Sequence, residues 1–234
     1  MQNERILVIS DLHFPFHHKD TFEFLSAIKR KYKPDRVICI GDEVDNHAMS
    51  FHDTDPDLYS PADELRAART YIWKLETMFP KMDIMESNHG SMFFRKSKKY
   101  GIPAAAMKSY NELWGVGPGW KWHTELTLKM SNGQKCYFHH GRYADVAKVS
   151  REYGMPAVQG HYHERYKIEY WANTEQLAWG MQVGCLADDH SLALAYNNTN
   201  LKRPIVGCGI IIDGHPKLLP MVLNKKHRWI KTLT

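Results

Sequence analysis

The sequence lacks several features that would assign it to a familiar class of protein. Its four cysteines, Cys39, Cys136, Cys185 and Cys208, are widely spaced and form no CxxC pair. This spacing argues against zinc ribbons and thioredoxin-like redox sites, which need such pairs. Each cysteine lies in an apolar stretch, so we expect all four to be reduced and buried.

Long apolar runs are also missing, and none could span a bilayer. The first residues, MQNERILVIS, lack the basic segment followed by a long apolar segment that marks a secretion signal. We find no internal repeat, low-complexity tract or linker. We therefore expect residues 1–234 to form one cytoplasmic domain without a membrane segment.

Histidine is the residue that the sequence has in excess. The chain contains 14 histidines, and several follow apolar runs beside Asp, Asn or Gly, where catalytic groups of α/β proteins collect. The net charge of +5 is mildly basic, which permits a polyanionic partner without requiring one. The ends of the apolar runs are therefore the places to search for function.

The first half of the chain predicts a β-α-β-α-β order. Two segments between the strands have apolar residues at helical spacing. Asp20 is expected to cap the first helix, and Ser60, followed by Pro61, to cap the second. Such an order favours a parallel sheet with short loops at the carboxyl ends of its strands. The predicted strands are residues 5–10, 36–41 and 82–87, and the predicted helices are residues 20–33 and 60–79.

The second half changes character. Residues 125–130 and 135–140, separated by SNGQ, predict an antiparallel hairpin, and residues 142–154 predict a helix that ends at a glycine. Residues 91–122 contain GVGPG and predict one or two short helices and a long loop. Further short strands are expected around residues 157–159, 165–171, 176–184, 206–213 and 217–223.

Five short polar patterns stand at the carboxyl ends of predicted strands. A lone histidine in such a position is more often structural, but the five patterns share one ligand chemistry. They offer carboxylates, imidazoles and one amide oxygen but no thiolate, which suits one or two first-row divalent ions. A carboxylate shared by two ions would hold them about 3.5–4 Å apart. The patterns are DLH (11–13), GDEVD (41–45), SNHG (87–90), HHG (139–141) and GHYH (160–163).

The order and spelling of these patterns resemble the calcineurin-like metallophosphoesterase family. Its signature reads DxH, GDxxD, GNH followed by an acidic residue, HG, and GHxH. The resemblance covers residues 5 to 165 by motifs and the whole chain by fold pattern. It implies an α/β four-layer sandwich, in which two mixed β-sheets pack face to face and helices flank them.

The resemblance also implies a site for two divalent metal ions, with Mn²⁺ expected first and Fe²⁺, Zn²⁺ or Ni²⁺ as alternatives. A hydroxide between the ions would attack phosphorus in line. His89 would face the substrate as general acid or charge stabiliser, and Asp45 would orient it. One ion would be held by Asp11, His13, Asp42 and His163. The other would be held by Asp42 as a bridge, Asn88, His140 and His161.

Two positions depart from the family pattern. Ser87 stands where the family has glycine before Asn88, and Gly90 stands where it has an acidic residue after His89. Neither position supplies a metal ligand in the pattern, so metal binding should survive. The missing acid leaves in doubt the support that the ligands receive from their surroundings. His139 is expected to point away from the ligand His140.

The substrate is less well defined by the sequence. Asn46, His47 and Arg95 are candidates for contacts with it. Protein phosphatases of the family carry an arginine at the position of Asn46. The stretch MFFRKSKKY (92–100) combines aromatic and basic residues, as sites for single-stranded nucleic acid do, although it also fits a helix with a solvated basic face. A second basic stretch, NKKHRWIK (224–231), is expected to be a surface tail.

These features favour a phosphodiesterase or nuclease that acts on DNA, RNA or nucleotides. The first alternative is a phosphomonoesterase that acts on a phosphoprotein or a small metabolite, because it would use the same metal ions. The second is a non-catalytic binding module on the same fold. The sequence does not indicate the oligomeric state.

Overall fold

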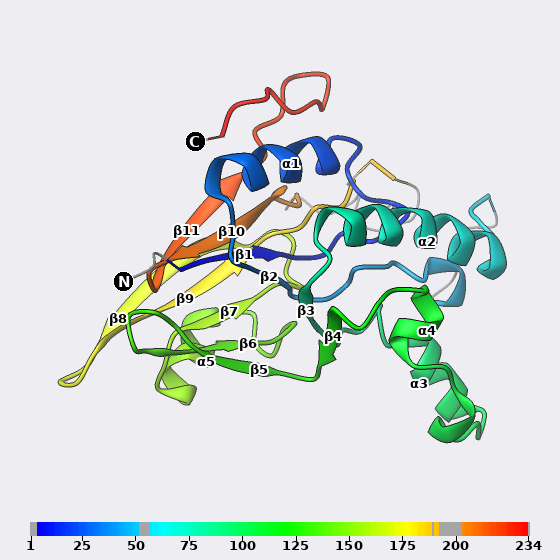
Figure 1. Cartoon of the computed structure of the whole chain (residues 1–234), viewed down its shortest axis with the longest axis horizontal. Coiled ribbons are helices and arrows are strands. Elements are labelled where there is room, and N and C mark those ends of the chain that lie inside the picture. Colours follow the sequence, from blue (N-terminus) through cyan, green and yellow to red (C-terminus); the bar gives the residue numbers. More distant parts are fainter. Residues whose placement is uncertain (1–3, 52–56, 189, 192–202, 234) are drawn as a thin grey trace.

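Two mixed β-sheets lie face to face at the centre of the structure (Figure 1). The computed structural model describes residues 4–51, 57–188, 190–191 and 203–233. The first sheet has six strands in the order β11-β10-β1-β2-β3-β4. Its strands are β1 (Arg5–Ile9), β2 (Arg36–Cys39), β3 (Met82–Met85), β4 (Trp120–His123), β10 (Gly207–Ile212) and β11 (His215–Pro220).

The second sheet has five strands in the order β5-β6-β7-β9-β8. Strands β5 and β6 form the predicted antiparallel hairpin, whereas β6, β7 and β9 run parallel. The predicted architecture of two mixed sheets is therefore confirmed. The strands are β5 (Leu126–Lys129), β6 (Lys135–Phe138), β7 (Ala157–Gln159), β8 (Tyr166–Ala172) and β9 (Leu177–Val183).

Helices cover the outer faces of both sheets (Figure 1). Helices α1 and α2 pack on the first sheet, and α5 packs on the second. Among the described residues, no helix combines the length and the apolar character needed to cross a membrane. The helices are α1 (Thr21–Tyr32), α2 (Pro61–Met78), α3 (Met92–Lys99), α4 (Tyr110–Trp114) and α5 (Val146–Tyr153), with short 3₁₀ turns η1 (His47–Met49) and η2 (Ala104–Ala106).

The central strand β1 is apolar because both of its faces are buried. Leu7 and Ile9 face the layer formed with α1 and α2, whereas Ile6 and Val8 face the second sheet. A strand covered on both faces has no position at which a polar side chain could reach water. This explains the continuous apolar run after Arg5 from which the strand was predicted, and why the next polar side chains come at its carboxyl end.

Strand β4 is the main element that the sequence analysis missed. Residues 91–122 form the predicted short helices α3 and α4, but the segment ends in a strand that pairs in parallel with β3. The Trp120 side chain is buried, and its indole N–H donates to the Phe79 carbonyl oxygen at 2.9 Å. The strand WKWH alternates tryptophans with polar residues, but it has only four residues and follows GVGPG, so the sequence signal is short and the pairing with β3 decides the structure.

The two helix caps of the first half have different outcomes. Ser60 caps α2 as predicted, since its hydroxyl accepts from the Asp63 N–H at 3.3 Å. Asp20 precedes α1, but its carboxylate caps no N–H of that helix. It instead binds the Arg228 guanidinium and accepts from the Trp229 N–H at 2.8 Å. Helix α5 begins at Val146, later than predicted, because Asp145 caps it there.

The prediction of a surface tail at residues 224–231 is confirmed for the exposed residues of that stretch but was wrong for Trp229. The C-terminal segment runs beside α1 (Figure 1), and Trp229 is buried against Phe24 with ring centres 5.3 Å apart. Arg228 brings its charge to the buried Asp20 carboxylate. A contact between residues 208 positions apart leaves no local trace in the sequence.

Replacing Asp20 by asparagine should loosen the C-terminal segment. Hydrogen bonds from Arg228 lower the pKa of the Asp20 carboxyl to about 2, so the folded state favours the charged form. The stabilisation is thus present above an unfolded pKa of about 3.9 and is lost as the pH falls towards 2. We expect a lower urea midpoint for Asp20→Asn at pH 6, and a difference from the unmodified protein that shrinks below pH 4. An equal difference at all pH values would contradict this.

Candidate metal centre

The five polar patterns meet at the carboxyl ends of β1, β2 and β3 in the first sheet and of β6 and β7 in the second. Backbone hydrogen bonds join the loops: the Asp11 N–H donates to the Gly41 carbonyl at 3.0 Å, and the His13 N–H donates to the Asp42 carbonyl at 2.9 Å. Asp11, His13, Asp42 and His161 all have positive φ angles, of 50°, 50°, 48° and 66°. Such conformations are unfavourable for side-chain-bearing residues and concentrate at functional sites.

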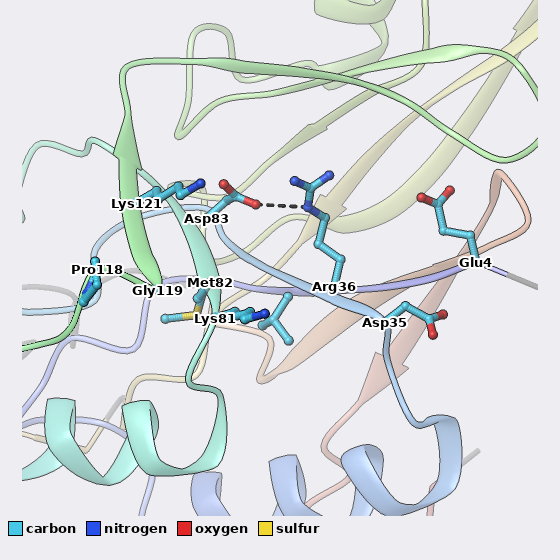
Figure 2. Close-up of a pocket in the computed structure, with 10 residues that line it drawn as sticks. Glu4, Asp35, Arg36, Lys81, Met82, Asp83, Pro118, Gly119 and Lys121 are labelled. Carbon is cyan, nitrogen blue, oxygen red and sulfur yellow. Dashed lines mark hydrogen bonds and ion pairs between the residues drawn. The ribbon is translucent and has the colours of Figure 1, made fainter.

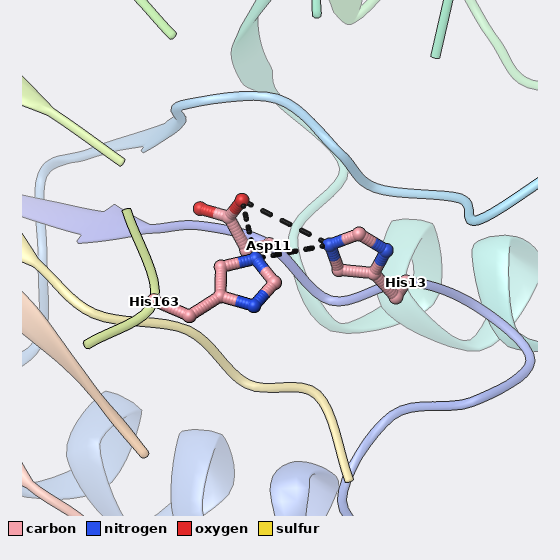
Figure 3. A group of neighbouring side chains, drawn as sticks. All are labelled: Asp11, His13 and His163. Carbon is pink, nitrogen blue, oxygen red and sulfur yellow. Dashed lines mark hydrogen bonds and ion pairs between the residues drawn. The ribbon is translucent and has the colours of Figure 1, made fainter. Parts of the chain in front are cut away.

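One ligand cluster contains Asp11, His13 and His163 (Figure 3). The His163 Nε2 atom lies 3.1 Å from Asp11 Oδ1 and 3.2 Å from His13 Nε2. His13 Nε2 is 3.9 Å from the same Asp11 oxygen. Two ring nitrogens and a carboxylate oxygen therefore face one another, which is the arrangement of ligands around a common ion.

The second cluster contains Asp42, Asn88, His140 and His161. His140 Nε2 lies 2.8 Å from Asn88 Oδ1, 3.2 Å from His161 Nδ1 and 3.2 Å from Asp42 Oδ2. The seven residues predicted to bind metal thus form two adjacent groups, divided as the family resemblance implied.

The Asp42 carboxylate lies between the two clusters. Its Oδ1 atom accepts from the His89 N–H at 3.0 Å. Its Oδ2 atom is 3.8 Å from His13 Nε2 in one cluster and 3.2 Å from His140 Nε2 in the other. This buried oxygen has no hydrogen-bond partner of normal geometry within the described residues. A buried carboxylate oxygen without a partner is costly, and a shared cation would remove that cost.

The tautomers of two histidines are fixed by their neighbours. His13 Nδ1 lies 2.6 Å from Asp45 Oδ1, and His140 Nδ1 lies 2.8 Å from the Ile40 carbonyl oxygen. Both oxygens can only accept, so each Nδ1 must carry the proton. In the neutral ring the Nε2 atom then keeps its lone pair for a metal. Metal-binding histidines commonly donate their other ring N–H to a carboxylate or carbonyl oxygen in this way.

The electrostatics of the site also suit cations. Burial alone would raise the pKa values of Asp11 and Asp42, but the neighbouring histidines lower both well below the usual range. Burial would lower the pKa of His140, yet Asp42, Asp11 and the Ile40 carbonyl together raise it to about 9. Burial would likewise lower the pKa of His13, but Asp11, Asp45 and Asp42 raise it, so in the metal-free protein His13 and His140 hold protons that compensate the carboxylates. Metal ions would take the place of these protons.

Two motif glycines are required by close packing. A Cβ atom at Gly160 would lie 1.9 Å from Ser10 Oγ and 2.5 Å from Asp11 Oδ2. A Cβ atom at Gly141 would lie 2.7 Å from the Cβ of His161. Side chains at either position would push the histidine loop away from the carboxylates, so these glycines allow the two sheets to share one site.

His89 and Asp45 contact each other differently from the prediction. The His89 Nδ1 atom lies 2.5 Å from the Asp45 backbone carbonyl oxygen and 3.6 Å from its carboxylate. The Asp45 carboxylate instead binds His13. Asp45 therefore contacts His89 mainly through its main chain, and its side chain supports a predicted metal ligand. The contact with Asp45 uses the Nδ1 atom of the half-buried His89 and not its Nε2 atom.

The three predicted substrate residues have different surroundings. The Asn46 side chain donates to the His89 carbonyl oxygen at 2.8 Å, so it positions the His89 loop. His47 begins η1, and its N–H donates to Glu64, a buried acid that the sequence analysis did not single out. Arg95 donates to the Asn88 carbonyl at 3.2 Å and lines the cleft.

The cleft beside the second cluster has a volume of about 520 Å³. It is lined by Asn88, His140 and His161 and by two cationic side chains, Arg95 and Arg142. Arg142 was missed, although it directly follows the HHG pattern and could have been found there. The Arg142 guanidinium forms an ion pair with Glu125, with Nη2 and Oε2 2.7 Å apart. A phosphate group in this cleft would meet both arginines.

His139 has no role among these ligands. Its ring is buried, and neither nitrogen has a hydrogen-bond partner within the described residues. Burial and the nearby Arg142 lower its pKa to about 3, so the ring is neutral at physiological pH. It packs against Tyr137 with ring centres 5.1 Å apart.

A second pocket, of about 620 Å³, lies at the amino ends of β2, β3 and β4 (Figure 2). It mixes basic and acidic side chains, and Arg36 donates to Asp83 there at 3.0 Å. Asp83 also lies 2.8 Å from His123 Nε2. None of the predicted metal ligands lines this pocket, so the chemistry is concentrated at the opposite end of the strands.

Replacing Gly160 by alanine should disrupt the centre. The new methyl group would collide with Ser10 and Asp11, and the loop bearing His161 would have to move. We expect Mn²⁺ affinity, measured by isothermal titration calorimetry, to fall about 10- to 100-fold. The control is Gly117→Ala, whose methyl would meet only the end of the Glu76 side chain at 3.3 Å. Unchanged affinity in Gly160→Ala would refute this account of the loop.

Several solved structures are similar to this chain at low sequence identity. The chain is similar to Vacuolar Protein Sorting 29 from Cryptosporidium parvum, with 15% identity, a TM-score of 0.47, and coverage of 92% of this chain and 95% of that one. It is similar to Vps29 from Chaetomium thermophilum, at 11% identity, TM-score 0.48, and coverage of 99% and 96%. It is also similar to the phosphoesterase YfcE from E. coli, at 12% identity, TM-score 0.47, and 98% coverage of both chains. At such identities and scores, these likenesses carry no argument about activity.

A comparison with curated protein sequences finds no significant match. The sequence model of one family, described as calcineurin-like phosphoesterase, matches residues 4–179. The match includes all five polar patterns and spans well over half of the chain. The protein therefore belongs to the calcineurin-like phosphoesterase family.

Proposed function

We propose that the protein is a dinuclear-metal-dependent phosphoesterase, with Mn²⁺ as the expected metal, and that it cleaves a phosphodiester in nucleic acid or a nucleotide. The observation that carries the proposal is the position of the Asp42 carboxylate, shared between two ligand clusters at the edge of a cleft. Two separate metal sites would not need a shared oxygen. A pair of ions held about 3.5–4 Å apart is typical of phosphoryl-transfer sites.

The residues present fit such a pair. Asp11, His13, Asp42 and His163 would hold one ion, and Asp42, Asn88, His140 and His161 the other. When bound, the ions would lower the pKa of a water molecule and neutralise charge on the phosphoryl oxygens.

We expect His89 to protonate the leaving oxygen or to stabilise charge on the phosphate. The Asp45 carbonyl accepts from its Nδ1, so Nε2 can carry a second proton. Its backbone is held at both ends, because its N–H donates to Asp42 and its carbonyl accepts from Asn46. A general acid fixed in this way contributes about 10²–10⁴-fold to the rate.

The basic surface beside the cleft supports a polyanionic substrate. The Arg95 guanidinium lies 5.2 Å from the centre of the Phe51 ring, and the Lys96 and Lys99 amines lie 5.3 and 5.6 Å from it. Phe51 is 45% exposed. A ring that bases can stack on, surrounded by cations that can bind phosphates, is the pattern of single-strand binding sites.

The two phenylalanines of α3 do not themselves form that surface. Phe93 and Phe94 are partly buried and pack against the core. Phe94 contacts Tyr110 with ring centres 4.5 Å apart. The helix therefore follows the alternative reading of apolar residues inward and basic residues outward, and Phe51 supplies the exposed ring from the segment after η1.

Two chromogenic esters would test the reaction. We expect faster turnover of a bis-aryl phosphodiester than of an aryl phosphomonoester, measured as initial rates in Mn²⁺. Asp42→Asn should abolish turnover because it weakens the shared ligand, and His89→Ala should lower it about 10²–10⁴-fold. A preference for the monoester would favour a phosphatase instead. Turnover of neither ester by a protein that binds Mn²⁺ would favour the non-catalytic binding module.

Phe51 and the basic residues around it should contribute to nucleic-acid binding. We expect Phe51→Ala to weaken binding of a short labelled single-stranded DNA by about 1–3 kcal/mol, roughly 5- to 150-fold in Kd. Lys99→Gln should reduce the slope of log K against log salt by about 1. Fluorescence anisotropy would measure both. The matched control is Tyr170→Ala, an exposed aromatic on β8. An equal loss in the control, or none in Phe51→Ala, would count against the surface.

A further inference from the structure

Glu43 is a buried carboxylate that the predicted mechanism does not use. It follows Asp42 directly, and its side chain is only 1% exposed. Neither carboxylate oxygen has a hydrogen-bond partner of normal geometry, and the carboxylate makes no ion pair within the described residues. The nearby Trp122 indole N–H likewise has no hydrogen-bond partner of normal geometry in the part of the chain that the structure describes. A buried carboxyl group without a partner is unfavourable whether or not it is ionised, so this acid requires an explanation.

The Glu43 carboxylate occupies the space beside Gly90. A Cβ atom at Gly90 would lie 3.0 Å from Glu43 Oε1 and 3.1 Å from Oε2. The same Cβ would lie 2.8 Å from Ser87 Oγ. A larger residue at position 90 therefore cannot coexist with both side chains in their present positions.

These residues include both departures from the family pattern. The family has glycine where this chain has Ser87, and an acid where it has Gly90. Here the Ser87 hydroxyl accepts from the Asp42 N–H at 2.8 Å and from the Gly90 N–H at 3.1 Å. The three residues are thus mutually adjusted: loss of the side chain at 90 makes room for Ser87 and for a carboxylate from another loop.

We propose that Glu43 replaces the acid that the family carries after the Asn-His pair, and that its charge strengthens metal binding. Asp11, Asp42, Glu43 and Asp45 together would carry four negative charges, which two divalent ions would balance. Glu43 would act through the field it adds behind Asp42, without touching metal or substrate. The inference rests on the proposed metal centre and explains how the centre tolerates Gly90.

Calorimetric titration with Mn²⁺ tests the charge directly. Glu43→Gln keeps the shape of the side chain and removes its charge, and we expect the affinity to fall about 10- to 100-fold. The melting temperature of the metal-free variant should not fall, because the substitution breaks no hydrogen bond of normal geometry. The matched control is Glu64→Gln. Glu64 is equally buried but accepts from the His47 and Ala48 N–H groups, so its replacement should lower the melting temperature and leave Mn²⁺ affinity unchanged.

A relocation experiment tests the exchange of positions. The variant Glu43→Ala/Ser87→Gly clears the space around position 90 and lacks the acid. Adding Gly90→Glu to it restores an acid at the position used by the family. We expect the triple variant to bind Mn²⁺ at least about tenfold more tightly than the double variant. Gly90→Glu alone should be destabilised by contact with Ser87 and Glu43.

The outcomes separate this inference from the proposed function. If the unmodified protein binds no Mn²⁺, both the metal centre and the role of Glu43 are wrong. If it binds two ions and Glu43→Gln binds them equally well, only the role of Glu43 is wrong. A melting temperature that falls in Glu43→Gln with unchanged affinity would make Glu43 a structural residue. No gain in the triple variant would overturn the equivalence of the two positions.

Discussion

The structure of the centre depends on a single buried carboxylate, that of Asp42. Its backbone joins the first two loops through the His13 N–H, and its own N–H is held by Ser87 of the third. One carboxylate oxygen holds the His89 backbone, and the other faces the imidazoles of both sheets. A charge placed there without cations would oppose folding, so the arrangement is stable only with protonated histidines or metal ions around it.

This dependence connects metal binding to the stability of the sheets. The motif histidines come from two sheets, and they approach one another closely only at the carboxylates. The glycines at 141 and 160 permit that approach, and the positive φ angles of Asp11 and Asp42 aim the side chains into it. The unfavourable backbone conformations are maintained by packing on both sides, which the continuous apolar strands provide. The sandwich therefore supports the geometry of the centre.

The features that could be predicted from the sequence are those with a local cause. Strand β1 was recognisable because burial of both faces removes all polar residues, and α2 because Ser60 and Pro61 start it in a standard way. The candidate ligands were recognisable because each pattern lies at the carboxyl end of its own strand. Whether each side chain binds metal or substrate stays a prediction.

The features that were missed depend on partners distant in the sequence. Strand β4 forms by pairing with β3. The Asp20 carboxylate binds Arg228 instead of capping the helix that follows it. The division of labour within Asp45, carbonyl to His89 and carboxylate to His13, is likewise set by where the loops meet. Patterns of residue types identify which groups a site contains, but the choice of partner among several acceptors requires coordinates.

The proposed metal ligands and the proposed substrate surface lie in different parts of this molecule. The ligands lie on loops held by two sheets, whereas the surface around Phe51 is built from α3 and the segment after η1, outside both sheets. Arg95 joins the two parts, since its guanidinium contacts the Asn88 backbone and also lies over Phe51. Changes in α3 could therefore alter which phosphate ester is bound while the ligand geometry stays intact. A change in one ligand loop would not be confined in this way, because the ligand loops support one another through Asp42.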